Sequence, residues 1–185
     1  MKRVTTNLSS PSLFAILFLL ASIPTYAQEL DTTKPHDEPD NLPADIEPSK
    51  MLNTLEHGLV PDSTEDQTDK LNAIMKMVGD NPQADTVYVP TGEYRIAKPI
   101  YLRPKVNLVG DGIGRTVFCR GDDANYLVRQ GGAGNFEGAV IANLSFRNQV
   151  RTLLMSNVHH LRFQNVEFEG GLVRFEKSSR ITIWS

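Results

Sequence analysis

The sequence predicts an all-β domain built as a single-stranded parallel β-helix, with one α-helix ahead of it. Three observations support this fold class. Short apolar segments recur every 20–22 residues in the last third of the chain, turn residues separate such segments every 6–12 residues, and one segment alone has convincing helical periodicity. Coils of this length, made of short strands, stack so that each buries the apolar face of its neighbour.

Three segments recur one coil later in the chain: Asn143–Phe146 as Asn165–Phe168, Leu153–Met155 as Val173–Phe175, and Leu161–Phe163 as Ile181–Ile183. The first spacing is 22 residues and the other two are 20. Asn143 and Asn165 each come directly before a strand. We therefore expect their side chains to stack and to form a hydrogen bond along the coil axis, at the roughly 4.8 Å spacing of neighbouring strands.

Ser185 stands where the next coil would place another asparagine, and the sequence stops there in mid-coil. We therefore expect the chain to be the front part of a longer β-helix, incomplete at its C-terminus. Further coils would cover the last one. The alternative is a partner chain that covers it.

The first 27 residues have the features of a secretory signal. Lys2 and Arg3 precede an apolar run from Leu13 to Ile23, and small residues lead to Ala27. The run is shorter than the roughly 20 apolar residues that span a bilayer. We predict cleavage after Ala27, a secreted or periplasmic protein, and no membrane contact after cleavage. Residues 28–50 are acidic and rich in proline, which predicts an extended or disordered linker.

The domain itself is predicted over residues 51–185, with a capping helix over about 65–78 and coils over 86–185. Thr64–Gln67 has the form of a capping box, and Gly79 is placed to end the helix. Apolar residues lie between them at i, i+3, i+4 and i+7, namely Leu71, Ile74, Met75 and Val78. Such a helix would cover the first coil, whose strand edges would otherwise be exposed.

Charge and cysteine content narrow the function classes. The net charge of −3 argues against a nucleic-acid-binding protein, which needs a clustered basic face. Cys119 is the only cysteine, so the chain cannot form an internal disulfide. We expect a buried thiol in a strand over Thr116–Arg120.

A family resemblance rests on five segments in the first part of the domain: Gly58–Asp62, Asp66–Leu71, Thr86–Tyr94, Val106–Gly112 and Thr116–Phe118. With these segments the chain resembles the pectate-lyase-like (pectin-lyase superfamily) right-handed β-helix proteins, over roughly residues 58–185. The resemblance implies a right-handed β-helix and an acidic or other extracellular polysaccharide as partner. Lyases, hydrolases, epimerases and phage tailspikes share these motifs, so no single reaction is implied.

The resemblance also implies how catalysis would work. Lyases of this group combine an arginine or lysine base with carboxylate-bound Ca²⁺, and its hydrolases use paired carboxylates. None of these catalytic motifs matches this chain residue by residue. Two local clusters are candidates instead. Arg174 and Glu176 point outward from one strand and are the candidate catalytic residues; the alternative is an exposed ion pair.

Glu167 and Glu169 are the candidate metal ligands, because they alternate outward on one face. The alternative is an ion pair between Glu169 and Arg147 one coil away. His159 and His160 also suggest a metal site, with solvent-facing turn residues as the alternative.

Two functions stay open: part of a polyuronate lyase, hydrolase or epimerase-like protein, or a non-catalytic glycan-binding or structural β-helix module.

Overall fold

The computed structural model of the chain describes residues 39, 41–120, 126–131 and 134–184, all within one unit of the fold, residues 34–185. The predicted signal segment lies outside the described residues. Along the chain the elements are η1 (Pro48–Lys50), β1 (Met51–Asn53), η2 (Thr54–His57), α1 (Thr68–Asp80), β2 (Thr86–Val89), β3 (Gly92–Ile96), β4 (Ile100–Leu102), β5 (Asn107–Gly110), β6 (Thr116–Arg120), β7 (Val128–Gln130), β8 (Phe136–Arg147), β9 (Arg151–Ser156), β10 (Val158–Glu169), β11 (Leu172–Glu176) and β12 (Ser179–Trp184).

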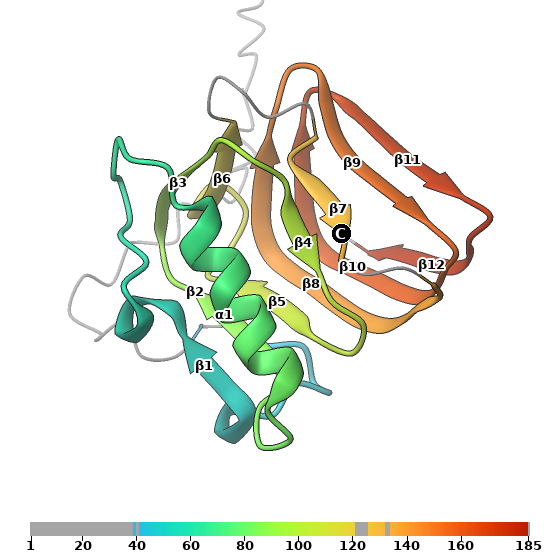
Figure 1. Cartoon of the computed structure of the whole chain (residues 1–185), viewed down its shortest axis with the longest axis horizontal. Helices are drawn as coiled ribbons and strands as arrows, with labels where there is room; N and C mark the ends of the chain where they lie inside the picture. Colours follow the sequence, from blue (N-terminus) through green and yellow to red (C-terminus); the bar gives the residue numbers. More distant parts are fainter. Residues whose placement is uncertain (1–38, 40, 121–125, 132–133, 185) are drawn as a thin grey trace, which may run out of the picture. The chain divides into compact units, whose positions relative to one another are not determined.

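These strands form a right-handed parallel β-helix of about four turns, which confirms the predicted fold class. One sheet has the order β1-β2-β5-β8-β10-β12, and β3 and β6 pair beside it, with β6 also pairing with β8. The second sheet has the order β4-β7-β9-β11. Figure 1 shows the coils following one another from the green strands to the red ones.

The repeat spacing predicted from the sequence matches the register in which strands of neighbouring coils pair. Leu161 pairs with Ile181, Leu153 with Val173, and Leu144 with Val166. β8 and β10 are each 12 residues long. Each contains an asparagine in the left-handed region, Asn143 with φ 56° and Asn165 with φ 52°, where the strand turns from one face of the solenoid to the next.

An aromatic stack fills the interior along the coil axis. Tyr94, Phe118, Phe146 and Phe168 are in register on β3, β6, β8 and β10. Their successive ring centroids are 5.8, 5.7 and 5.6 Å apart. Because each ring packs on the ring of the next coil, the stack ties the coils together through the core.

The helix α1 covers the first coil, as expected, lying over β2 and β4 (Figure 1). All four residues of its predicted apolar stripe are buried. The predicted start was wrong, however. The helix begins at Thr68, because the preceding segment runs extended beside β3: Ser63 bridges to Tyr94, and the Gln67 amide donates to the Arg95 carbonyl at 2.9 Å.

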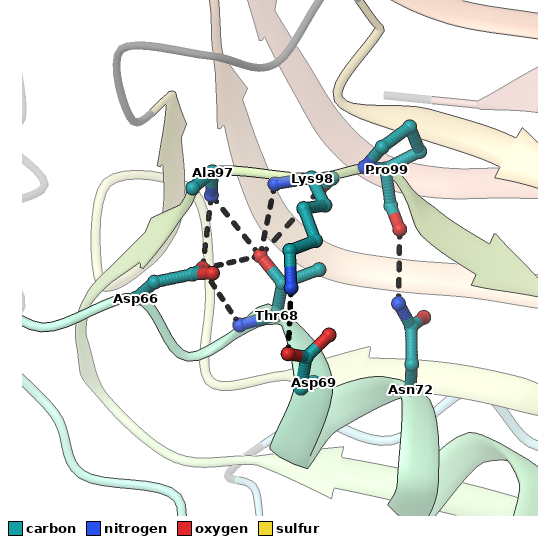
Figure 2. A network of polar contacts seen from close by, with 7 residues as sticks. All are labelled: Asp66, Thr68, Asp69, Asn72, Ala97, Lys98 and Pro99. Atoms are coloured by element: carbon teal, nitrogen blue, oxygen red, sulfur yellow. Dashed lines mark hydrogen bonds and ion pairs between the residues drawn. The ribbon is translucent and has the colours of Figure 1, made fainter.

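Gln67 makes no side-chain cap, so the predicted capping box does not form. Asp66 takes over this role and ties the helix to the β3–β4 connection. Its Oδ1 accepts hydrogen bonds from the amides of Thr68 and Ala97, both at 2.9 Å (Figure 2). Asn72 donates to the Pro99 carbonyl at 2.9 Å in the same network.

Gly79 does not end the helix, which continues to Asp80. The glycine instead leaves room for the Arg103 side chain to pack closely against the helix. A Cβ at this position would lie 2.8 Å from Nε of Arg103.

The segment expected to be a linker is ordered in its described part. Ile46 is 6% exposed and packs on the outer face of the β5–β8 sheet, with Leu42 beside it. Asp45 forms an ion pair with Arg162 on β10. Composition predicted an extended or disordered linker as far as residue 50. Burial of two apolar side chains is enough to order the segment here, because the sheet already offers an apolar face that receives them.

Among the described residues, no helix is both long and apolar enough to cross a bilayer.

Candidate functional site

The outer face of the β4-β7-β9-β11 sheet carries the most distinctive set of side chains, which we call the arginine face. Its central row is in register across four coils, with Tyr101, Arg129, Leu154 and Arg174 side by side. The residues next to them on β4 and β9 point inward and are buried, and their counterparts on β11 are partly buried, because alternate residues of a strand face opposite sides. Tyr101 is 43% exposed, so an aromatic ring and arginines share one accessible surface.

Two guanidinium groups meet at one aromatic ring on this face. The Cζ atoms of Arg129 and Arg151 lie 5.7 and 5.3 Å from the ring centroid of Tyr126. Nη1 of Arg151 is also 3.4 Å from the Tyr126 hydroxyl. Neither arginine is paired with a carboxylate within the described part of the chain. Two like charges near one ring repel each other, so an anion bound between them is favoured electrostatically.

The candidate pair Arg174 and Glu176 lies on the same face. Nη2 of Arg174 is 2.8 Å from Oε1 of Glu176, with side chains 58% and 42% exposed. Ser156, one coil earlier, donates to Glu176 Oε2 at 3.4 Å, and its amide donates to Gln130 Oε1 at 2.8 Å. An exposed pair of this kind stabilises the fold by about 0–1 kcal/mol. A catalytic role for the two residues stays a prediction.

The arginine face has few acids. Glu176 is the only carboxylate residue in β4, β7, β9 and β11. Glycoside hydrolysis usually needs two carboxyl groups on either side of the scissile bond. The strands of this face can therefore bind and orient an anion, and they supply at most one member of such a pair.

Glu167 and Glu169 lie on a different face, the outer surface of β3, β6 and the second halves of β8 and β10. Oε2 of Glu169 lies 2.6 Å from Nε of Arg147, which confirms the predicted cross-coil ion pair. Arg147 also pairs with Glu93 on β3. The hydrogen bond that Arg147 donates to Glu169 raises the pKa of Arg147, against the smaller opposing effect of burial.

Both carboxylates have protein partners in this structure, and a metal-binding role for them stays a prediction. Ser145 Oγ donates to Oε2 of Glu167 at 2.9 Å, so both glutamates are bound to donors of the neighbouring coil. Calcium takes about six to eight oxygen ligands. Over the described residues, no group of three or more His, Cys, Asp or Glu side chains is arranged to hold a metal ion.

The tandem histidines also have other partners. Nδ1 of His159 is 2.7 Å from the Ser179 hydroxyl, and Nε2 of His160 is 2.7 Å from Nη1 of Arg180. A guanidinium donor beside the His160 nitrogen competes with a metal ion for the same lone pair. The predicted turn was wrong: both histidines lie in β10, where His159 pairs in register with Glu137 and Ser179, and His160 has φ 58° within the strand.

The sequence did not reveal a pocket of ≈ 250 Å³ beside Arg147, lined by Asp62, Ser63, Thr64, Glu93, Arg95, Cys119 and Arg120. The predicted strand Thr116–Arg120 is confirmed, but Cys119 faces this pocket and is only half-buried. Phe118 points inward, so its neighbour in the strand must point outward. Burial raises the pKa of the thiol, and the charge of Glu93 adds to the effect.

Comparisons with known proteins place the chain in a family context. Residues 51–180 match the family described as rhamnogalacturonase A/epimerase, pectate lyase-like. No curated protein matches the chain.

Three solved structures share the fold. The A-module of the mannuronan C-5 epimerase AlgE4 of Azotobacter vinelandii is 20% identical, with a TM-score of 0.57, over 71% of this chain and 42% of that one. The surface protein and adhesin PfbA of Streptococcus pneumoniae is 14% identical, with a TM-score of 0.65, over 73% and 40%. ORF18 of Geobacillus virus E2 is 18% identical, with a TM-score of 0.56, over 63% and 25%. The chain therefore spans less than half of each of these proteins.

Proposed function

Because the chain belongs to the rhamnogalacturonase A/epimerase, pectate lyase-like family, we propose that it forms the N-terminal part of an exported protein acting on a polyuronate or a related anionic glycan. The reaction would be of the lyase, hydrolase or epimerase type. The single observation that carries the proposal is the convergence of Arg129 and Arg151 on Tyr126.

The arginine face suits a chain of acidic sugars for three reasons. A guanidinium group binds a carboxylate through two parallel hydrogen bonds, which a lysine cannot do. The rings of Tyr101 and Tyr126 offer apolar surface beside these charges, against which a sugar ring can pack. Neighbouring coils repeat at about 4.8 Å, so the face presents its groups as an extended row.

On this face the residues have separate roles. Arg129 and Arg151 bind the uronate carboxylate, and Tyr126 holds the two guanidinium groups at one place. Arg174 and Glu176 are the proposed catalytic residues; Ser156 positions Glu176. With one carboxylate in its strands, the face supports proton abstraction beside a bound uronate better than hydrolysis by two acids.

Export is part of the proposal and is supported by the signal features of the first 27 residues. One structural neighbour, PfbA, is a surface adhesin, which is compatible with export. The idea that more coils complete the active protein is supported by the small share of the AlgE4 A-module that this chain covers, 42%.

A non-catalytic glycan-binding module is the second candidate, and the scarcity of acids on the arginine face favours it. The two candidates differ in one measurement. Purified protein is incubated with polygalacturonate and alginate, and assayed for unsaturated products, new reducing ends and inversion at C5. Product from either polymer supports the enzyme; retention on these polymers without any product, also by a longer chain that includes further coils, supports the module.

The control variants define the site. Replacement of both Arg129 and Arg151 by Gln should weaken retention on polygalacturonate at least tenfold and leave retention on neutral galactan unchanged. Arg147→Gln is the matched control, because Arg147 pairs with Glu93 and Glu169 on the outer surface of β3, β6, β8 and β10, which is a different face. If the double variant binds polygalacturonate as the wild type does, the proposed glycan site is wrong.

A further inference from the structure

Residues 41–46 lie against the outer face of β5, β8 and β10, which is not the arginine face. Val109, Val140 and Ala142 form an apolar floor there, and Leu42 and Ile46 cover it. Val109 and Ala142 have no exposed surface in this arrangement. A strip of three apolar side chains on the outside of the solenoid would face water without this cover.

Two polar contacts hold the segment at its sides. Asp45 forms an ion pair with Arg162, whose side chain is only 26% exposed. The hydrogen bond from Arg162 holds the pKa of the Asp45 carboxyl below its usual value, although burial opposes this. The Arg162 side of the contact is shielded, but the Asp45 side chain is 56% exposed, so the pair holds the segment about as strongly as a surface ion pair does.

The second polar contact completes the asparagine stack. The Asn143 side-chain amide donates to the backbone carbonyl of Asn41 and accepts from Asn165 at 3.0 Å. In the preceding coil, the register places Gly110 opposite Asn143. Glycine has no side chain to accept this hydrogen bond, so the Asn41 carbonyl replaces the missing asparagine.

We propose that this groove on the outer face of β5, β8 and β10 is a docking surface for a short acidic segment of the type Asn-Leu-Pro-Ala-Asp-Ile, filled in cis by residues 41–46 as a releasable strap. The segment contains a turn in which the Ile46 amide donates to the Pro43 carbonyl at 2.9 Å. The apolar floor, the Arg162 cation and the Asn143 amide each have a partner in the segment. Cleavage of the signal after Ala27 leaves the strap in place. The inference does not depend on the glycan site.

The strap is held by few groups, so single substitutions should release it. In the full-length chain, Ile46→Ser should raise amide hydrogen exchange over residues 41–50 about tenfold, while exchange in β9 and β11 stays unchanged. Asp45→Asn should produce a smaller increase. Glu47→Gln is the matched control, because Glu47 forms its ion pair among the described residues with Lys50, three residues away. Unchanged exchange in Ile46→Ser would overturn the proposal.

A peptide of residues 41–50 then tests the groove directly by fluorescence anisotropy. It should bind the full-length Ile46→Ser chain at least tenfold more tightly than the wild type, whose groove is filled, and the Asp45→Asn peptide should bind more weakly. Equal binding to both proteins, or no binding to a variant whose strap has been released, would contradict it. A dimer in which each copy supplies the strap of the other would overturn the cis arrangement.

If Ile46→Ser lowers protection throughout the domain, the Asp45→Asn chain takes its place in both experiments. The same outcomes then decide the question. Arg162→Gln tests the groove side of the ion pair, and should reduce peptide binding to the released chain.

Discussion

Nδ2 of Asn165 donates a 3.0 Å hydrogen bond to Oδ1 of Asn143, one coil earlier in the solenoid. Both residues have left-handed backbone, with φ 52° and 56°. Asparagine suits this position for two reasons. It tolerates the left-handed region, and its side chain carries both a hydrogen-bond donor and an acceptor. The stack thus links the turns of successive coils, as the aromatic rings link their interiors.

Substitution of Asn143 separates these two contributions. Asn143→Gly keeps the backbone freedom and loses the stack, and should destabilise the protein by about 1–3 kcal/mol through the unpaired partners. Asn143→Ala should cost about 1 kcal/mol more, because alanine is strained in the left-handed region. Urea unfolding measures both. Equal stability of the two variants would show that the backbone conformation contributes nothing.

The middle of the aromatic stack should be its most sensitive point. Phe146 is fully buried, with Phe118 at 5.7 Å on one side and Phe168 at 5.6 Å on the other. Phe146→Ala should lower the free energy of unfolding by about 3–5 kcal/mol. Phe168→Ala, at a half-buried position, should lower it by roughly half as much. Denaturant midpoints at constant m-value provide the comparison.

Asp66 should make the cap of the solenoid sensitive to acid. Burial opposes its charge, but hydrogen bonds from Thr68 and Ala97 outweigh burial and hold the pKa of Asp66 below its usual value. A lowered pKa adds stability that is complete above the unfolded-state pKa of about 3.9, and that is lost as the pH falls through the folded-state pKa.

Asp66→Asn keeps a side-chain oxygen acceptor and removes the charge, so it should lower stability at pH 7 by less than the about 1 kcal/mol of a lost helix cap and should make the fall in stability below pH ~4 shallower. Thermal unfolding at a series of pH values measures this. The matched control is Glu65→Gln, at the exposed neighbouring position. A profile for Asp66→Asn as steep as that of the wild type would contradict the assignment.

Opposite changes are expected from the two members of the candidate catalytic pair. Arg174 and Glu176 neutralise each other at 2.8 Å. Glu176→Gln removes the competing carboxylate and should tighten polygalacturonate binding about twofold to threefold at low salt, whereas Arg174→Gln should weaken it by a similar factor. Affinity electrophoresis in polygalacturonate gels reads both directly. A shift in the same direction for both would show that the pair acts only on stability.

Local patterns accounted for the coils and for the apolar face of the helix. Alternation of apolar residues predicts a strand, and recurrence of the same alternation predicts the register of its neighbour, as between Leu161 and Ile181. The capping box predicted at Thr64–Gln67 does not form, because a tertiary contact overrides the local pattern there. Pairing with β3 holds that segment extended, and no local signal at those four residues shows this tertiary contact.

The candidate sites divide in the same way. The pairs Arg147–Glu169 and Arg174–Glu176 follow from repeat spacing and from strand alternation, so the sequence was enough to predict them. The meeting of Arg129 and Arg151 at Tyr126 does not follow from any repeat, because it depends on how two coils of unequal length align. The pocket beside Cys119 likewise joins a loop to two strands.

The sequence by itself therefore determined the parallel β-helix, its asparagine stack and the ion pair between Arg147 and Glu169, since all of these follow from repetition along the chain. Tertiary structure alone decided where the helix begins, which arginines share a ring, and that Leu42 and Ile46 fold back on the outer face. The physical reason is range: periodicity is a property of neighbouring residues, whereas burial of an isolated side chain depends on the surface that distant residues create for it.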